Sequence, residues 1–356
     1  MPKLIPHNRL TFGDAECESV VRAVRSGQWA QGARVEELET QLCRISGVRH
    51  AVCVASGLGA LRLAVGALGV RAGDRVLVPA YSCVALANAV LAWDASPIPV
   101  DVETESWTID HLKCTRECDA WSPRAVIAVN TFGAPADVER IGSEDLPVIE
   151  DCAHAFGSGI RGKPFGARAQ VGVLSFYATK LIGGGEGGAV LTNRSAVAES
   201  VRQARDYGDQ LADGHRLNDK MNELEAALVL AQLDRLPEMI RKRAMLAERY
   251  VERLSNPKFG GIFRMPGRMS ERIWYRFALE MLTVSAEKVV KDLLQFDVHA
   301  ALPITDWRPT GSAAAPVSDR AYRNLVSLPL YPTLTVEEQD TVVDAFLGLC
   351  EGYTRA

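Results

Sequence analysis

Ser175-Phe-Tyr-Ala-Thr-Lys180 is the most informative segment of this chain, and it continues as Leu181-Ile-Gly-Gly-Gly-Glu-Gly-Gly188 and Ala189-Val-Leu-Thr192. The pattern predicts a strand, a lysine, a glycine-rich loop and a second strand. A lysine facing such a loop lies where the backbone can approach a ligand closely and where desolvation can lower the pKa of its amine. Lys180 is therefore a candidate for forming a Schiff base, although a lysine at a strand end is more often a solvated surface charge.

A second segment, Leu146-Pro-Val-Ile-Glu-Asp151-Cys-Ala-His154, predicts a short buried strand that ends in two carboxylates and is followed by a histidine. Strands without polar alternation are typical of parallel sheets covered on both faces, and ligands bind at the carboxyl ends of those strands. Asp151 is therefore expected at a site. A carboxylate there can pair with a protonated pyridine nitrogen, which pyridoxal phosphate needs to act as an electron sink. Lys180 and Asp151 together suggest that cofactor.

Three segments resemble the DegT/DnrJ/EryC1/StrS family of fold-type I pyridoxal-phosphate enzymes, namely Val148-Ile-Glu-Asp-Cys-Ala-His154, Ser175-Phe-Tyr-Ala-Thr-Lys180 and Glu186-Gly-Gly188. The resemblance covers nearly the whole chain, from Ser26-Gly27 to Ser327-Leu-Pro-Leu-Tyr-Pro-Thr-Leu-Thr335. The commonest members of this family are sugar aminotransferases. The resemblance therefore implies an α/β fold with a mostly parallel central sheet flanked by helices and a smaller C-terminal α+β domain.

The length of the chain and the order of its predicted elements agree with that fold. The 356 residues suit roughly two domains rather than one small core. Predicted strands alternate with helices from residue 50 to residue 190, which favours a doubly wound, mostly parallel sheet. We expect residues 1–240 to form a large cofactor-binding domain that includes the N-terminal segment. Residues 241–356 are expected to form a small C-terminal domain.

Composition argues against several other classes of protein. A formal net charge of −4 disfavours a nucleic-acid-binding protein, which would normally carry a basic surplus. The start of the chain lacks the apolar core of a signal peptide, and no later run is long enough to span a membrane, so we expect a soluble cytoplasmic protein. The eight cysteines are spread along the chain and are expected to be reduced. Cys114 and Cys118 have no second pair at zinc-site spacing, so no metal site is expected.

A helix is predicted near the N-terminus, capped by Asp14. Its apolar residues Cys17, Val20, Val21 and Val24 fall on one face. The helix is expected to be a packing element that takes no part in chemistry.

The segment Ala51-Val-Cys-Val-Ala55 predicts a strand, and Ser56-Gly57-Leu58-Gly59 then opens a helix. A helix N-terminus presents unpaired N–H groups and the positive end of the helix dipole, and glycines let an anion approach them. Gly57 and Leu58 are therefore expected to bind the cofactor phosphate, although a tight turn without a ligand would show the same pattern. Because the family usually has Ser-Gly-Thr here, Leu58 loses a threonine hydroxyl while the backbone N–H groups remain.

The resemblance also implies roles for residues elsewhere in the chain. His154 is expected against the cofactor ring, and Ser175 is expected to bind the phosphate together with Gly57 and Leu58. Similar proteins extend an asparagine across a dimer interface to the phosphate of the neighbouring subunit, and the matching residue here is Asn218. The alternative for Asn218 is an exposed asparagine that caps the following helix.

Two further positions depart from the family pattern. The arginine that usually follows that asparagine is replaced by Lys220, which keeps the charge but not the planar fork of donors. The aromatic residue that commonly stacks on the cofactor ring corresponds to Cys83. Either Tyr81 or another group therefore covers the ring, or its face is left to an apolar contact.

The glycines from residue 183 to residue 188 also fit the G-x-G-x-x-G pattern of dinucleotide-binding proteins. That pattern is convincing only where a strand precedes it and a helix follows it. Here the strand-like Ala189-Val-Leu-Thr192 follows, which argues against a nicotinamide-dependent dehydrogenase.

The resemblance implies a pyridoxal-phosphate-dependent aminotransferase that acts through a Lys180 Schiff base, with glutamate as donor and a nucleotide-linked keto sugar as acceptor. It also implies a homodimer whose active sites are shared between two chains. A keto-cyclitol acceptor remains open. A sugar dehydratase of the same family would carry histidine in place of Lys180, which argues against that activity. A sensor that keeps the fold without turnover is a further alternative, which Leu58 and Cys83 leave open.

Overall fold

The computed structural model describes residues 4–142, 146–208, 216–267 and 269–353. Across these residues, seven strands form one sheet in the order β1-β9-β8-β5-β4-β2-β3. Strand β9 is antiparallel to both of its neighbours, and the remaining pairs are parallel, so the predicted mostly parallel sheet is confirmed. The strands are β1 (His50–Val54), β2 (Arg75–Pro79), β3 (Ser96–Val100), β4 (Ala125–Val129), β5 (Val148–Asp151), β8 (Val171–Ser175) and β9 (Gly188–Thr192).

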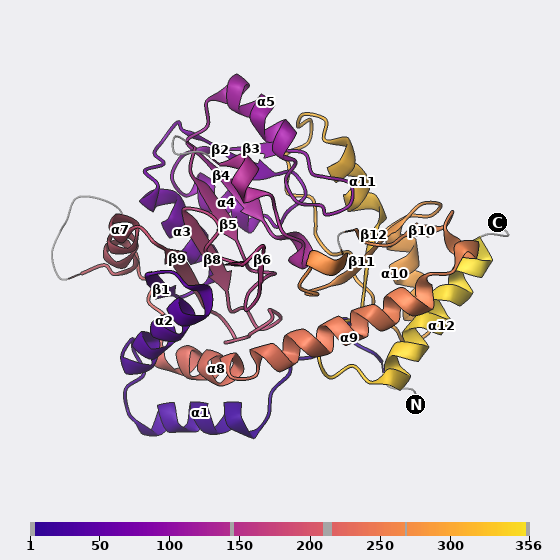
Figure 1. The fold of residues 1–356 in the computed structure, drawn as a ribbon, viewed down its shortest axis with the longest axis horizontal. Helices are drawn as coiled ribbons and strands as arrows, with labels where there is room; N and C mark the ends of the chain where they lie inside the picture. Colours follow the sequence, from indigo (N-terminus) through magenta and orange to yellow (C-terminus); the bar gives the residue numbers. More distant parts are fainter. Residues whose placement is uncertain (1–3, 143–145, 209–215, 268, 354–356) are drawn as a thin grey trace.

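Helices cover both faces of this sheet (Figure 1). Alternate residues of β1 show why: Val52 and Val54 are buried in one hydrophobic cluster, and Ala51 and Cys53 are buried in another. The first cluster includes residues of α3 (Gly57–Ala67), α4 (Ala85–Leu91) and α7 (Ser195–Arg205). The opposite face packs against α2 (Ala33–Ser46), α8 (Glu223–Leu233), α5 (His111–Trp121) and α6 (Val138–Ile141). A short hairpin of β6 (Gly159–Ile160) and β7 (Lys163–Pro164) precedes β8.

The C-terminal part is built around a second sheet of three antiparallel strands among the described residues, in the order β10-β11-β12. This sheet has its own hydrophobic cluster, which includes Phe277 and Phe346. The N-terminal segment joins it, because Ile5 pairs with Val298 and is buried in the same cluster. The elements are β10 (Phe263–Arg264), β11 (Phe277–Met281), β12 (Leu325–Leu328), α10 (Ala286–Leu294), α11 (Pro316–Asn324) and α12 (Val336–Tyr353).

Helix α9 (Leu236–Leu254) is continuous and runs from the large sheet to the C-terminal sheet (Figure 1). Leu236 and Met239, at its start, are buried in a cluster of the large sheet, whereas Tyr250, near its end, is buried in the C-terminal cluster. The expected boundary between residues 240 and 241 falls inside this helix and stays a prediction.

Helix α1 (Asp14–Arg25) lies along the outside of α8 (Figure 1). Its N-cap is Gly13, whose amide donates to the Glu16 carboxylate at 2.8 Å, so Asp14 is the first helical residue and not the predicted cap. The apolar residues Val21 and Val24 are 45% and 46% exposed, and Cys17 is exposed as well. The helix itself packs on α8, where the Ser19 hydroxyl donates to the Ala227 carbonyl at 2.8 Å, but much of the predicted apolar face is exposed.

None of the helices among the described residues is both long enough and apolar enough to cross a membrane. No group of three or more histidine, cysteine, aspartate or glutamate side chains in the same part of the chain is arranged to hold a metal ion. Cys114 and Cys118 are free thiols on α5, one buried and one partly buried.

Candidate active site

Lys180 lies in the loop between the antiparallel strands β8 and β9, beyond the end of β8 at Ser175. The loop folds back on itself, because the Ala178 amide donates to the Gly185 carbonyl at 3.0 Å. A Cβ atom on Gly183 would lie 2.8 Å from the Ala178 carbonyl oxygen, so this position has room only for glycine. The glycine loop is therefore a tight turn that holds Lys180 in place.

One cavity of about 260 Å³ brings together six of the seven residues predicted for the site. It opens at the carboxyl ends of β5 and β8 and at the N-terminus of α3. This is the edge at which parallel sheets bind ligands. The predicted residues that line it are Gly57, Leu58, Asp151, His154, Ser175 and Lys180.

Gly57 and Ser175 approach each other closely at one end of this cavity. A Cβ atom on Gly57 would lie 2.7 Å from the Ser175 Cβ, so only glycine fits there. The Ser56 hydroxyl caps α3 by accepting a hydrogen bond from the Gly59 amide at 2.9 Å. The first N–H groups of a helix have no partner within it, and the positive end of the helix dipole faces the same space. This end of the cavity has the chemistry of an anion site.

Asp151 is 4% exposed and ends β5 at the cavity. Burial raises the pKa of its carboxyl group, and the Ala153 amide and the Lys180 cation oppose that effect. One carboxylate oxygen accepts a hydrogen bond from the Ala153 amide at 2.8 Å. A cation entering the cavity would stabilise the ionised form of this buried carboxylate.

Glu150, the neighbouring residue on β5, belongs to a different cluster. It is fully buried, and Arg168 donates to its Oε1 from Nε and Nη2 at 2.8 and 2.6 Å. Asn130 donates to the same oxygen at 3.0 Å, and the Gly166 amide donates to Oε2 at 3.0 Å. Glu150 is therefore fully hydrogen-bonded, and it stabilises the structure behind the cavity.

His154 lies between two aromatic rings. Its ring stacks on Tyr275 with centroids 4.2 Å apart and on Phe132 at 6.0 Å. The Phe132 amide donates to His154 Nδ1 at 3.3 Å, so Nε2 carries the proton of the neutral ring. Burial, followed by the Lys180 and Arg276 cations, lowers the pKa of His154 well below its usual value. His154 is therefore a neutral hydrogen-bond donor at this cavity.

Tyr275 is a site residue that sequence reasoning missed. The Lys180 Nζ lies 5.3 Å from the centre of its ring. Burial alone would raise the pKa of the Tyr275 hydroxyl, but the Lys180 and Arg276 cations and a hydrogen bond with Thr179 outweigh burial and lower the pKa to about 8. The only local signal is the aromatic pair Trp274-Tyr275 before an apolar strand, which does not distinguish a site from a core.

Tyr81 and Cys83 both line the cavity. The Tyr81 ring packs edge-on against Tyr322, with centroids 4.8 Å apart. Its hydroxyl is buried, and no described residue hydrogen-bonds it. Cys83, at the position where the family commonly has an aromatic residue, is exposed towards the cavity opening. An unsatisfied buried hydroxyl in a cavity is typical of a site that holds a polar ligand.

Asn218 is the one predicted site residue that does not line the cavity. It is exposed on the segment before α8. The cap of α8 is Asn222, whose side chain accepts from the Glu225 amide at 2.9 Å, so Asn218 is not the helix cap. Lys220 pairs with Asp206 at 2.9 Å and is therefore already engaged within the chain.

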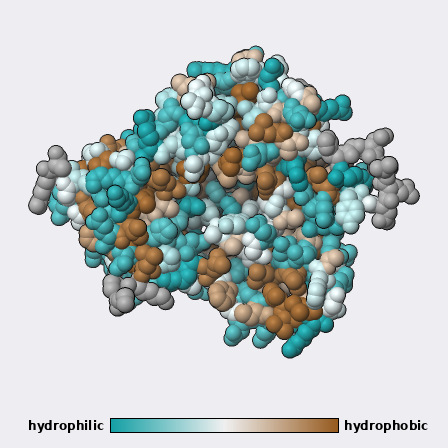
Figure 2. All heavy atoms as spheres, turned by 180° about the vertical axis from the view of Figure 1, so that it is seen from behind, coloured by the Kyte–Doolittle hydropathy of each residue, from teal (hydrophilic) through white to brown (hydrophobic). Residues whose placement is uncertain are grey.

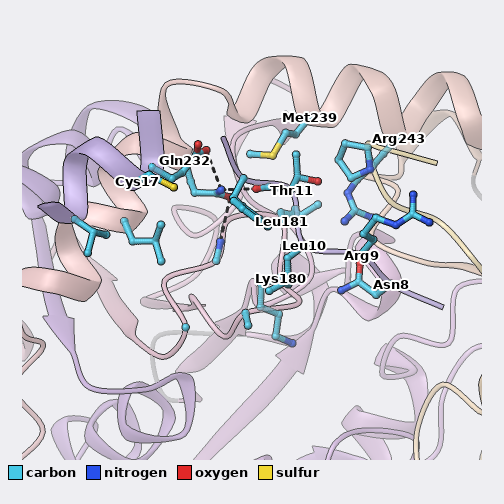
Figure 3. A pocket seen from close by; sticks show the side chains of 18 of the residues that line it. Asn8, Arg9, Leu10, Thr11, Cys17, Lys180, Leu181, Gln232, Met239 and Arg243 are labelled. Carbon is cyan, nitrogen blue, oxygen red and sulfur yellow. Dashed lines mark hydrogen bonds between the residues drawn. The ribbon is translucent and has the colours of Figure 1, made fainter. Parts of the chain in front are cut away.

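A larger pocket of about 500 Å³ lies on the other side of Lys180 (Figure 3). Its walls come from the N-terminal segment, α1, α8, α9 and the glycine loop. Figure 3 shows Asn8, Arg9 and Arg243 together at one end and Cys17 and Gln232 at the other. The Lys180 loop thus separates an apolar pocket from the cavity that holds Asp151.

Comparisons with known proteins agree with this geometry. The model of the DegT/DnrJ/EryC1/StrS aminotransferase family matches residues 11–347. The chain is similar to the aminotransferase TlmJ from Streptoalloteichus hindustanus, with 26% identity and a TM-score of 0.91 over 99% of this chain and 100% of that one. It is similar to DesV from S. venezuelae, with 28% identity and a TM-score of 0.84 over 97% and 99% of the two chains. NtdA from Bacillus subtilis, solved with bound cofactor PMP, shows 26% identity and a TM-score of 0.86 over 99% and 86%.

The cavity fits pyridoxal phosphate by its own chemistry. The N-terminus of α3 and Ser175 line one end of the cavity, which suits an anion. Asp151 supplies a buried carboxylate, the Tyr81 hydroxyl lacks a partner among the described residues, and Lys180 supplies an amine. Together with the match across residues 11–347, this shows that the chain belongs to the DegT/DnrJ/EryC1/StrS aminotransferase family and is a pyridoxal-phosphate-dependent aminotransferase.

Proposed function

We propose that this enzyme transfers an amino group from L-glutamate to the carbonyl carbon of a nucleotide-linked keto sugar. The observation that carries the proposal is the meeting of Lys180, Asp151 and Ser175 in one cavity. The choice of a sugar acceptor rests on the family, whose commonest members are sugar aminotransferases.

Lys180 is the proposed catalytic residue. When bound, pyridoxal phosphate supplies an electron sink that stabilises the negative charge left on the substrate carbon after a proton is removed. Lys180 would hold the cofactor through its ε-amine, then take the proton from the substrate carbon and return it. Its place in a tight glycine turn limits its motion to the side chain.

The other predicted residues would hold and tune the cofactor. Asp151 would stabilise a positive charge on the pyridine nitrogen, because it is a buried carboxylate that lacks a full counter-charge. His154 would donate a hydrogen bond from Nε2, since Nδ1 already accepts from the Phe132 amide. Ser175 and the amides of Gly57 and Leu58 would bind the phosphate at the start of α3.

We also propose that the enzyme is a homodimer in which Asn218 reaches the cofactor phosphate of the partner chain. Asn218 is exposed and lies outside its own cavity, as such a role requires. Figure 2 shows hydrophobic residues gathered along the edge of the molecule where α1 lies. Exposed apolar patches of this kind are typical of protein interfaces. The exposed side chains there are Leu10 (51%), Phe12 (69%), Val21 (45%), Val24 (46%) and Trp29 (57%).

The proposal is tested by supplying L-glutamate together with a panel of nucleotide-linked keto sugars and keto-inositols, and by measuring release of 2-oxoglutarate. We expect sustained release with a keto sugar and none with the Lys180→Ala variant. Release only with a keto-inositol would assign the enzyme to cyclitols instead. A protein that binds the cofactor but never releases 2-oxoglutarate with any acceptor would contradict the proposed function and favour a sensor.

A further inference from the structure

Arg243, which is buried, and Arg276, which is half-buried, form a cationic cluster near Lys180. Arg243 is 4% exposed, and its Nη1 donates to the carbonyls of Tyr275 and Leu330 at 3.1 and 2.9 Å. Its Nε is buried, and no described residue accepts from it. Arg276 donates from Nη1 to His7 Nε2 at 3.5 Å. Within residues 4–142, 146–208, 216–267 and 269–353, neither guanidinium has a carboxylate at ion-pair distance.

The groups around the two arginines do not supply the missing negative charge. Burial and then the charges of Arg276, His299 and Arg243 lower the pKa of His7 to about 3, so His7 is neutral. Its Nε2 lies 2.8 Å from the Ser327 hydroxyl. Tyr275, with a pKa of about 8, is mostly protonated at neutral pH. The cluster therefore has a net positive charge.

A small cavity of about 60 Å³ opens between these side chains. It is larger than the space one water needs and far smaller than a sugar nucleotide, and it suits a single carboxylate group. Thr179, the neighbour of Lys180, lines it together with His7, Asn8 and both arginines. Tyr275 connects this cavity with the site of Lys180, because its ring centre is 5.3 Å from Lys180 Nζ and 5.4 Å from Arg276 Cζ.

Other cations near the site already have partners. Arg9 lines the larger pocket, but it pairs with Glu338 at 2.6 Å and lies over the Tyr331 ring. Lys220, at the place where the family usually has an arginine, pairs with Asp206. A buried guanidinium without a counter-charge, such as that of Arg243, lowers the stability of the fold, so stability does not explain its presence. An anionic ligand that binds between Arg243 and Arg276 removes that cost.

We propose that Arg276 and Arg243 bind the α-carboxylate of the amino donor and of the keto acid formed from it. The proposal rests on the proposed function, because it places the carbon that loses its amino group beside Lys180. A guanidinium can donate two parallel hydrogen bonds to a carboxylate, which fixes the orientation of the group as well as its position. The donor is accordingly an α-amino acid, and amines without an α-carboxylate are poor donors.

Binding without turnover tests this proposal. The holoenzyme in its lysine-bound cofactor form is titrated by calorimetry with 2-oxoglutarate and with 2-oxobutyrate, which keeps the α-carboxylate and lacks the γ-carboxylate. Arg276→Gln is expected to weaken both ligands by about 10- to 100-fold, the effect of losing hydrogen bonds to a charged group. Arg276→Lys, which keeps the charge but loses the fork, is expected to weaken them less. Arg9→Gln, a cation already paired in the same region, is the matched control and is expected to change neither affinity by more than about twofold.

Two results would overturn the proposal. Unchanged binding of both keto acids by Arg276→Gln and Arg276→Lys would remove Arg276 from the site. Weaker binding of 2-oxoglutarate alone would show that Arg276 contacts the γ-carboxylate instead. If Arg276→Gln weakens both keto acids while wild-type enzyme releases no 2-oxoglutarate from glutamate with any acceptor, the carboxylate site stands and the proposed function fails.

Discussion

Glu150 and Asp151 are consecutive carboxylates on one strand, yet they belong to regions of opposite character. Glu150 meets Arg168, Asn130 and the Gly166 amide, and every charge in that cluster has its partner. Asp151 faces a cavity, beyond which Arg243 and Arg276 lie without carboxylate partners among the described residues. Successive residues of a strand point to opposite faces of the sheet, so two adjacent carboxylates can have different roles. The complete cluster around Glu150, in which every charge is paired, stabilises the fold. The region of the two cavities, where Arg243 and Arg276 lack carboxylate partners among the described residues, indicates ligand binding.

The largest effect on stability is expected from breaking the complete cluster. Glu150→Gln leaves the Arg168 guanidinium buried without a counter-charge, which should cost about 3–5 kcal/mol. The measurement is the thermal unfolding midpoint of the cofactor-free protein. Asp151→Asn is the matched control, one residue away with the same isosteric change, and should alter stability by less than about 1 kcal/mol because the wild-type carboxylate is itself penalised by burial. Equal losses in the two variants would remove the distinction between the regions.

For activity, in contrast, the large effect is expected from the Asp151 variant, because Asp151 faces the cavity. Asp151→Asn should slow the reaction with glutamate by about 100- to 1,000-fold, because a neutral amide cannot stabilise a developing positive charge on the cofactor ring. The measurement is the rate at which the cofactor absorbance changes after rapid mixing with glutamate. A wild-type rate in this variant would show that Asp151 has no part in the chemistry.

Several site residues could be predicted from the sequence because each belongs to a local pattern with a fixed place in the fold. Asp151 ends an uninterrupted apolar strand, and Gly57 opens a helix after another. Parallel strands end at a common edge, so these residues had to meet. Lys180 was placed by its glycine loop, although it lies within the loop and not at the strand end.

The cationic cluster could not be predicted, because its members come from separate elements. Arg243 is on α9, Arg276 directly precedes β11, and His7 belongs to the N-terminal segment. Their meeting depends on how the C-terminal sheet packs beside the large one, which no local pattern encodes. The exposure of one face of α1 could not be predicted for a related reason. The apolar periodicity of Val21 and Val24 identifies an apolar face but does not show which chain that face packs against.

A smaller effect concerns pH. The folded-state pKa of His7 is about 3, and that of an unfolded histidine is about 6.5, so the unfolded chain binds a proton that the folded chain does not. This part of the stability is fully present above pH 6.5 and is lost as pH falls towards 3, by about 2 kcal/mol at pH 5. His7→Gln should flatten the fall of the unfolding midpoint between pH 6.5 and pH 5. A fall of unchanged steepness would mean that burial and the neighbouring Arg276 cation do not hold His7 neutral.

The smallest effect is expected from filling the open side of the cofactor cavity. Cys83→Phe restores an aromatic residue at the position where the family commonly has one, and should tighten pyridoxal phosphate binding by about 2- to 10-fold. The measurement is a cofactor titration of the cofactor-free protein. Weaker binding would show that Tyr81 already occupies the space that an aromatic side chain at residue 83 would need.

The most direct test of the central claim is the visible absorbance spectrum of the purified holoenzyme before and after excess L-glutamate, beside that of Lys180→Ala. If Lys180 holds the cofactor and is displaced by the donor, as proposed, the wild-type protein is expected to show a yellow band that glutamate bleaches. The variant is expected to lack this response. A colourless wild-type protein that takes up no pyridoxal phosphate, or a Lys180→Ala variant that bleaches like the wild type, would contradict the role of Lys180.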